Sequence, residues 1–239
     1  RQKALESGLP PEHIEVTGLP VNPVFGSNPD KAELRRRLGW SEDRCVALMA
    51  GSKRVKKLEP LAHVLNHSGL PLELAIVAGG DKELHSRLSE VEWHLPAHVY
   101  GFVDDMPALM LAADFIVCKA GGLIVSEALA AGLPLLLVEA IPGQETGNAE
   151  YVERGGAGVL VEDAVAGLTT IYHWLMHDRA ELHQRAERAC TLGKPQAAMR
   201  VAELALAAAN EGAERRVRRL GTETTLLNKL LSGLDLDLG

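Results

Sequence analysis

Cysteine is scarce in this chain, and its spacing excludes two kinds of site. The 239 residues contain three cysteines, Cys45, Cys118 and Cys190, which lie far apart and form no CxxC or Cys/His pattern. The first two fall inside apolar runs that predict buried strands, so we expect reduced thiols that fill a core. The sequence therefore predicts neither a disulfide framework nor a metal site.

Long apolar runs and an excess of positive charge are also missing. Asp114, Lys119 and Glu139 interrupt the most apolar stretches, so none reaches the roughly 18 residues that a membrane-spanning helix needs. The formal net charge is −7. Although basic residues cluster at 53–57 and 215–219, this balance makes nucleic acid an unexpected partner. We expect a cytoplasmic protein.

The two ends of the chain differ from its centre. Residues 1–28 contain turn-forming pairs such as Pro10-Pro11 and suit an interdomain linker at the start of a domain. Because the chain starts at Arg1 with neither Met nor a signal peptide, we expect a piece of a longer protein. Residues 212–239 carry a basic run and a Leu-rich stretch, which leave two alternatives: a C-terminal helix that docks on an absent domain, or a disordered tail.

Residues 29–211 alternate between short apolar runs and helical patterns. Strands are predicted at 45–50, 73–78, 98–101, 115–118, 134–138 and 158–161. Helices are predicted near 30–38, 56–67, 82–93, 105–112, 123–131, 146–154, 163–176, 179–191 and 196–211. Several helices follow a suitable N-cap residue: Asp30, Asp81, Asp105 and Asp163. This alternation is typical of βαβ units, so we predict an α/β fold with a Rossmann-like, doubly wound parallel sheet.

The loop after the strand at 115–118 has the pattern of a phosphate site. Gly121 and Gly122 allow the backbone to approach a ligand, and the next helix would present the free N–H groups of Leu123 and Ile124. Glu127, one turn further on, is placed to accept hydrogen bonds from ribose hydroxyls. A simple tight turn with a solvated Glu127 is the alternative that this loop alone leaves open.

The following loop carries polar groups that suit a sugar. Gln144, Glu145 and Asn148 place an amide, a carboxylate and a second amide beyond the strand at 134–138. Such groups pair with hydroxyls and discriminate strongly against the wrong epimer. The alternative is that Gln144 and Glu145 only cap the next helix.

Together these loops resemble the C-terminal domain of GT-B glycosyltransferases of family 28, most closely the monogalactosyldiacylglycerol synthases and diacylglycerol glucosyltransferases. The similarity covers TGLPVNPVF at 17–25, a long central stretch at 101–152 with KAGGL and PGQETGN, and GAGVLV at 156–161. It implies one half of a two-domain fold. It also implies an inverting hexosyltransferase that moves galactose or glucose from a UDP-sugar to a lipid acceptor such as diacylglycerol, without a further cofactor or metal.

The resemblance also assigns roles to individual residues. The backbone of Phe102 and Val103 would hold the uracil, and Glu127 would hold the ribose. Gly122, Leu123 and Ile124 would hold the diphosphate. The donor sugar would contact Gln144, Glu145 and Asn148. The general base is expected in a missing N-terminal acceptor domain, so the catalytic residues stay unknown and this chain alone is not expected to catalyse transfer.

One loop departs from the family. Where the family has a glycine-rich loop after the first strand, this chain has Gly51 followed by Ser52, Lys53 and Arg54. These side chains would either donate to phosphate or narrow the site. Peripheral membrane association through the full-length protein is a further expectation. Two alternative functions remain: a stand-alone nucleotide-sugar-binding module, and half of a UDP-N-acetylglucosamine 2-epimerase.

Overall fold

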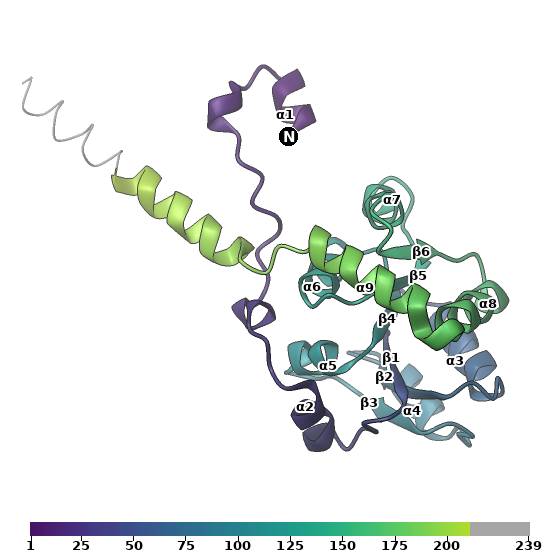
Figure 1. Cartoon of the computed structure of the whole chain (residues 1–239). Coiled ribbons are helices and arrows are strands. Elements are labelled where there is room, and N and C mark those ends of the chain that lie inside the picture. Colours follow the sequence, from purple (N-terminus) through teal and green to yellow (C-terminus); the bar gives the residue numbers. More distant parts are fainter. Residues whose placement is uncertain (211–239) are drawn as a thin grey trace, which may run out of the picture. The chain divides into compact units, whose positions relative to one another are not determined.

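A computed structural model describes residues 1–210, and six parallel strands form its single sheet (Figure 1). The strands are β1 (Cys45–Ala50), β2 (Leu72–Val77), β3 (Ala97–Tyr100), β4 (Phe115–Lys119), β5 (Leu135–Glu139) and β6 (Gly158–Leu160). Each end lies within one residue of its predicted position. The spatial order is β3-β2-β1-β4-β5-β6, so the doubly wound sheet is confirmed and its winding direction reverses between β1 and β4.

Helices follow the strands along the chain. They are α2 (Lys31–Leu38), α3 (Leu58–Asn66), α4 (Lys82–Ser89), α5 (Met106–Ala112), α6 (Gly122–Ala130), α7 (Thr146–Arg154), α8 (Ala164–Leu175) and α9 (Ala180–Leu192). The predicted aspartate caps are confirmed, since Asp30, Asp81, Asp105 and Asp163 each accept a hydrogen bond from a first-turn backbone N–H.

The helix predicted at 82–93 ends early, at Ser89. Beyond it, the indole N–H of Trp93 donates to the Leu88 carbonyl oxygen, 3.2 Å away. The buried side chain of Asn66 accepts from the backbone N–H of His94 at 2.6 Å. This local contact and the contact with the distant Asn66 stabilise a loop where helical propensity alone favours more helix.

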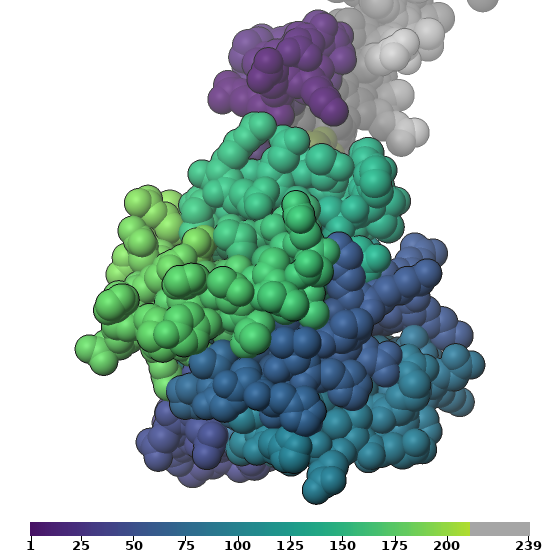
Figure 2. Space-filling model, turned by 90° about the vertical axis from the view of Figure 1, so that its right-hand side faces the viewer, coloured from purple at the N-terminus to yellow at the C-terminus, as the bar shows by residue number. Residues whose placement is uncertain are grey.

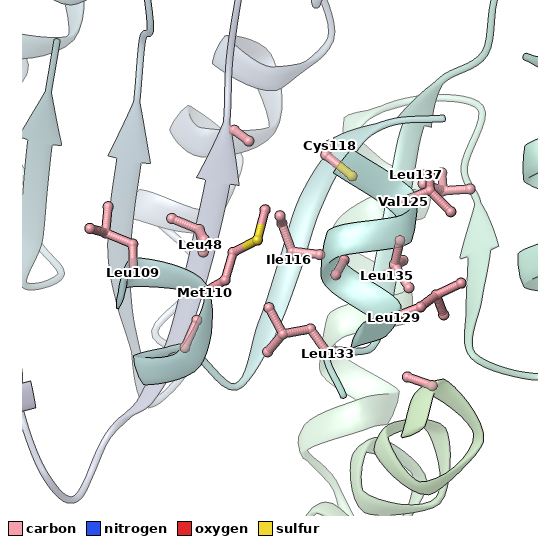
Figure 3. Close-up of a cluster of buried hydrophobic side chains, with 14 of the residues drawn as sticks. Leu48, Leu109, Met110, Ile116, Cys118, Val125, Leu129, Leu133, Leu135 and Leu137 are labelled. Carbon is pink, nitrogen blue, oxygen red and sulfur yellow. The ribbon is translucent and has the colours of Figure 1, made fainter. Parts of the chain in front are cut away.

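Two apolar layers cover the faces of the sheet, because successive strand residues point to opposite sides. In β1, Val46 and Leu48 pack with α5, α6 and α7, a cluster that Figure 3 shows in part. Ala47 and Met49 pack on the other face with α3, α4 and α8. Figure 2 shows the outer surface of that second layer, where the green α8 lies against the blue α3. Burial raises the pKa of the Cys45 and Cys118 thiols to about 12, as expected for packing cysteines.

The N-terminal segment already contributes to the core. It contains α1 (Gln2–Glu6) and the short 3-10 turns η1 (Pro11–His13) and η2 (Pro23–Gly26). Val21 and Phe25 are buried against the α5 and α6 side of the sheet. The structure therefore places the end of the predicted linker within the packed fold, while its role between domains stays a prediction.

The chain divides into two units, Arg1–Ala198 and Met199–Gly239, and residues 197–210 are helical. The alternatives for 212–239 concern residues outside the described part of the chain. Across residues 1–210, no helix is long and apolar enough to cross a lipid bilayer.

A polar cluster at the amino-terminal edge of the sheet ties α2 to the strands. The carboxylate of Asp114 accepts from Lys31 Nζ at 2.8 Å, Arg35 Nη2 at 2.6 Å and the Val46 N–H at 2.7 Å. The Arg35 side chain is buried, and its Nε also donates to the Ala112 carbonyl at 2.9 Å. Burial raises the pKa of Asp114, but the two cations and the Val46 N–H outweigh this effect and hold it below its ordinary value.

Replacing Asp114 with Asn tests this cluster. We expect a loss of about 3 kcal/mol in unfolding free energy at pH 7, because the Arg35 guanidinium is left buried without a counter-charge. Because the folded-state pKa is depressed, the contribution is present above the ordinary value of 3.8 and is lost as pH falls through the lower folded value. Urea unfolding between pH 2 and 7 measures it. The exposed Asp43→Asn is the control, and equal effects of both variants would contradict the prediction.

Candidate functional site

A cavity of about 480 Å³ lies at the carboxyl ends of the strands, where the winding of the sheet reverses. The loops that follow β1, β2, β3, β4 and β5 form its walls. The cavity brings together eleven of the twelve residues proposed from the sequence: Gly51, Ser52, Phe102, Val103, Gly121, Gly122, Leu123, Ile124, Glu127, Gln144 and Glu145. The ligand contacts assigned to these residues stay predictions.

Helix α6 begins at the wall of this cavity. Its N-cap is Gly121, which has no side chain that could cap the first turn. The first N–H groups of a helix have no partner within the helix, and the helix dipole adds positive potential at that end. The Leu123 side chain is exposed, whereas Ile124 packs partly against the core. The geometry therefore leaves backbone donors of α6 available to an anion.

Glu127 lies one turn into α6, half-buried in the cavity wall. Burial raises the pKa of its carboxyl above the ordinary value of 4.5. A carboxylate that loses hydration without gaining a counter-charge is typical of a site that awaits a ligand. The half-buried position suits the ribose role, which stays a prediction.

Glu145 is the most buried polar residue of the cavity, with 3% of its surface exposed. Its Oε1 forms an ion pair with Lys119, and its Oε2 accepts from the Ile141 N–H at 3.1 Å. Glu145 occupies the N-cap position of α7, but its side chain makes no capping hydrogen bond. The capping alternative is thus wrong for Glu145, whereas Gln144 is exposed at the cavity wall.

Asn148 is the predicted residue that does not line the cavity. Its Nδ2 donates to the Ala120 carbonyl at 2.9 Å, so it joins α7 to the loop that precedes α6. In this structure Asn148 supports the shape of the loop, and its contact with a donor sugar stays a prediction.

The loop after β1, which departs from the family pattern, supplies only part of its residues to the cavity lining. Ser52 lines the cavity, and its hydroxyl oxygen accepts from the Arg54 N–H at 3.3 Å. The Lys53 and Arg54 side chains are exposed and are not part of the lining. The bulky residues therefore do not fill the cavity, and Ser52 supplies the polar side chain of this loop.

Lys119 is the functional candidate that sequence reasoning missed. It is the last residue of β4 and lines the cavity with an ammonium group directed at Glu145. A lysine that ends an otherwise buried apolar strand, two residues before a Gly-Gly pair, was the available signal. Met106 and Val55 add apolar lining that has no motif of its own.

Comparison with known proteins places the chain in a family. Residues 47–204 match the glycosyltransferase family 28 C-terminal domain. The chain belongs to this family. It is 35% identical over 209 residues to a probable chloroplastic monogalactosyldiacylglycerol synthase of Glycine max, covering 84% of this chain and 39% of that protein. The monogalactosyldiacylglycerol synthase of Spinacia oleracea is 34% identical, with 84% and 40% covered. The chain thus spans about two fifths of these relatives.

Solved structures show the same fold. MnaA of S. aureus with UDP superposes with a TM-score of 0.63 at 17% identity, covering 84% of this chain and 56% of that one. MurG of Acinetobacter baumannii has a TM-score of 0.55 at 23% identity, covering 75% and 54%. The family 28 domain described here is a Rossmann-like half of the GT-B architecture, as its motifs predicted.

The raised pKa of Glu127 predicts a stabilising variant. At pH 7 the ionised carboxylate mildly destabilises the folded state, so Glu127→Gln is expected to raise the unfolding free energy. Because solvent screens this half-exposed group, the gain should stay below about 0.5 kcal/mol. The gain should vanish below the ordinary carboxyl range, where Glu127 is protonated in both states. Chemical unfolding at pH 7 and pH 3 measures both. The exposed Glu162→Gln serves as control, and a destabilised Glu127→Gln would refute the interpretation.

Proposed function

We propose that this chain is the donor-binding domain of an inverting hexosyltransferase that transfers galactose or glucose from a UDP-sugar to a lipid acceptor such as diacylglycerol. The observation that carries the proposal is the uncapped start of α6 in the cavity wall. Family membership supports transfer in preference to epimerisation or binding alone. The names of the relatives support a diacylglycerol acceptor and galactose.

The start of α6 suits a diphosphate. A Cβ added at Gly122 would meet Leu19 Cδ1 at 3.5 Å and Asn148 Nδ2 at 3.7 Å, which are ordinary contacts. Packing within the chain therefore does not require glycine at this position, whereas close approach of phosphate oxygens to the helix N–H groups does.

The remaining walls suit the other parts of a UDP-sugar. Glu127 would accept from the ribose hydroxyls, and the backbone of Phe102 and Val103 would pair with uracil. Gln144 and Glu145 would hold the hexose, since their amide and carboxylate pair with hydroxyl groups. The solved UDP complex of similar fold supports a uridine nucleotide.

The proposed reaction is displacement at the anomeric carbon by an acceptor hydroxyl. The dipole and N–H groups of α6 would stabilise negative charge as it develops on the departing UDP. Neither a metal nor a further cofactor is part of the proposal. The general base and the acceptor groove would come from an N-terminal domain of the full-length enzyme, and a lipid acceptor implies peripheral association with a membrane.

Calorimetric titration with UDP and ADP tests the donor site. We expect UDP to bind more tightly than ADP. Glu127→Gln should weaken UDP binding about tenfold, the scale of a lost hydrogen bond to a charged group. Because only the ionised carboxylate accepts from both hydroxyls, UDP affinity should fall as pH drops through the raised pKa of Glu127. Glu162→Gln is the control, and equal binding of UDP and ADP would refute the proposal.

Gly122→Ala tests whether phosphate binds at the start of α6, and it does so without disturbing the fold. The added methyl group makes only ordinary contacts in the folded chain, so we expect an unchanged or slightly higher melting temperature. UDP affinity should fall about tenfold or more, because the methyl group stands where phosphate would approach. The matched control is Gly147→Ala in α7, where a Cβ meets nothing within 4 Å. Undiminished UDP binding by Gly122→Ala would rule out α6 as the phosphate site.

A further inference from the structure

Lys119 carries the one positive charge among the described residues that line the cavity. Its ammonium group is paired with Glu145, whose side chain is 4% exposed compared with 26% for Lys119. The pair links the end of β4 to the loop before α7, two segments that are 26 residues apart in the sequence. The two loops that form the phosphate and sugar walls are therefore joined by one ion pair.

Gly121 shows how closely the loop fits this ion pair. Its φ of −69° and ψ of 138° are open to any residue, so its backbone conformation does not require glycine. A Cβ there would lie 3.2 Å from Lys119 Nζ, 3.4 Å from Lys119 Cε and 3.6 Å from Glu145 Oε1. The first glycine of the pair thus leaves room for Lys119, and the second leaves room for a ligand.

The position of the Glu145 carboxylate depends on Lys119. The Ile141 N–H donates a hydrogen bond to Oε2, and the Lys119 ammonium group supplies the counter-charge at Oε1. Without Lys119, the buried Oε1 would lose its cationic partner, which favours a different rotamer of the Glu145 side chain. A rotated carboxylate no longer presents its acceptor oxygens in the same place to neighbouring hydroxyls.

We propose that Lys119 is a positioning residue that determines donor-sugar specificity by holding the Glu145 carboxylate in a fixed position against the hexose. The inference rests on the proposed UDP-sugar function and adds a residue to it. The hexose hydroxyls would meet a carboxylate whose position is set from the phosphate loop. Discrimination between epimers, which depends on the placement of hydroxyl partners, then depends on a lysine that need not touch the sugar.

The test compares UDP-galactose with UDP-glucose on the whole chain. The two donors carry the same charge, so a general electrostatic effect of a variant changes both affinities equally and leaves their ratio unchanged. We expect the wild-type chain to prefer one epimer by about tenfold or more. Lys119→Met should reduce this preference to within about threefold at pH 7, and Lys119→Arg should retain most of it. The exposed Lys82→Met is the matched control.

A double variant keeps the proposal testable if Lys119→Met does not fold. Lys119→Met/Glu145→Gln removes both charges and leaves no unpaired buried ion, so it should fold even if Lys119→Met does not. Circular dichroism and melting temperature check folding. We expect the double variant to bind UDP and to show no epimer preference.

The outcomes separate the two proposals. If the wild-type chain does not bind UDP, the donor-domain function fails and this inference fails with it. If the wild-type chain binds UDP, either of two results overturns the role of Lys119 alone. One is equal binding of the epimers by wild type, and the other is a preference that persists in both folded variants.

Discussion

The parallel pairing of β1 with β4 is the constraint on which the site depends. The chain winds outward from β1 through β2 to β3 and then returns to place β4 on the other side of β1. Connections from these two central strands therefore leave toward opposite halves of the sheet, and a crevice opens between them at the carboxyl end. Every cavity-lining loop begins at this edge. The apolar faces that fix the strand register consequently also fix the positions of the polar groups.

Most of this arrangement could be predicted from local sequence. Runs such as CVALMA and FIVCK are short, apolar and separated by helical patterns, and FIVCK also carries two β-branched residues, so their strand positions follow from local sequence. The aspartate caps likewise act within one turn. The cavity residues were found because they immediately follow predicted strands, and the sheet rule places such residues at one edge. The family motif then supplied the roles that spacing alone left open.

What escaped prediction depends on contacts between distant segments. The ion pair of Lys119 with Glu145 and the contact of Asn66 with His94 beyond the end of α4 both need partners that lie far along the chain. In the sequence, Asp114 is only an interruption of an apolar run, yet in the fold its carboxylate accepts hydrogen bonds from two cationic side chains and a strand N–H. Such roles follow from the tertiary fold and leave little trace in the hydrophobic periodicity of the sequence.

The hydrogen bond from Asn148 to the Ala120 carbonyl has a consequence for how such domains diversify. Together with the ion pair, it makes the segment from the end of β4 to the start of α7 a single interlocked unit. Exchanging the β5–α7 loop between relatives would break contacts with the loop it left behind. An exchange that preserves these contacts therefore has to carry both loops together with the helix and the strand between them.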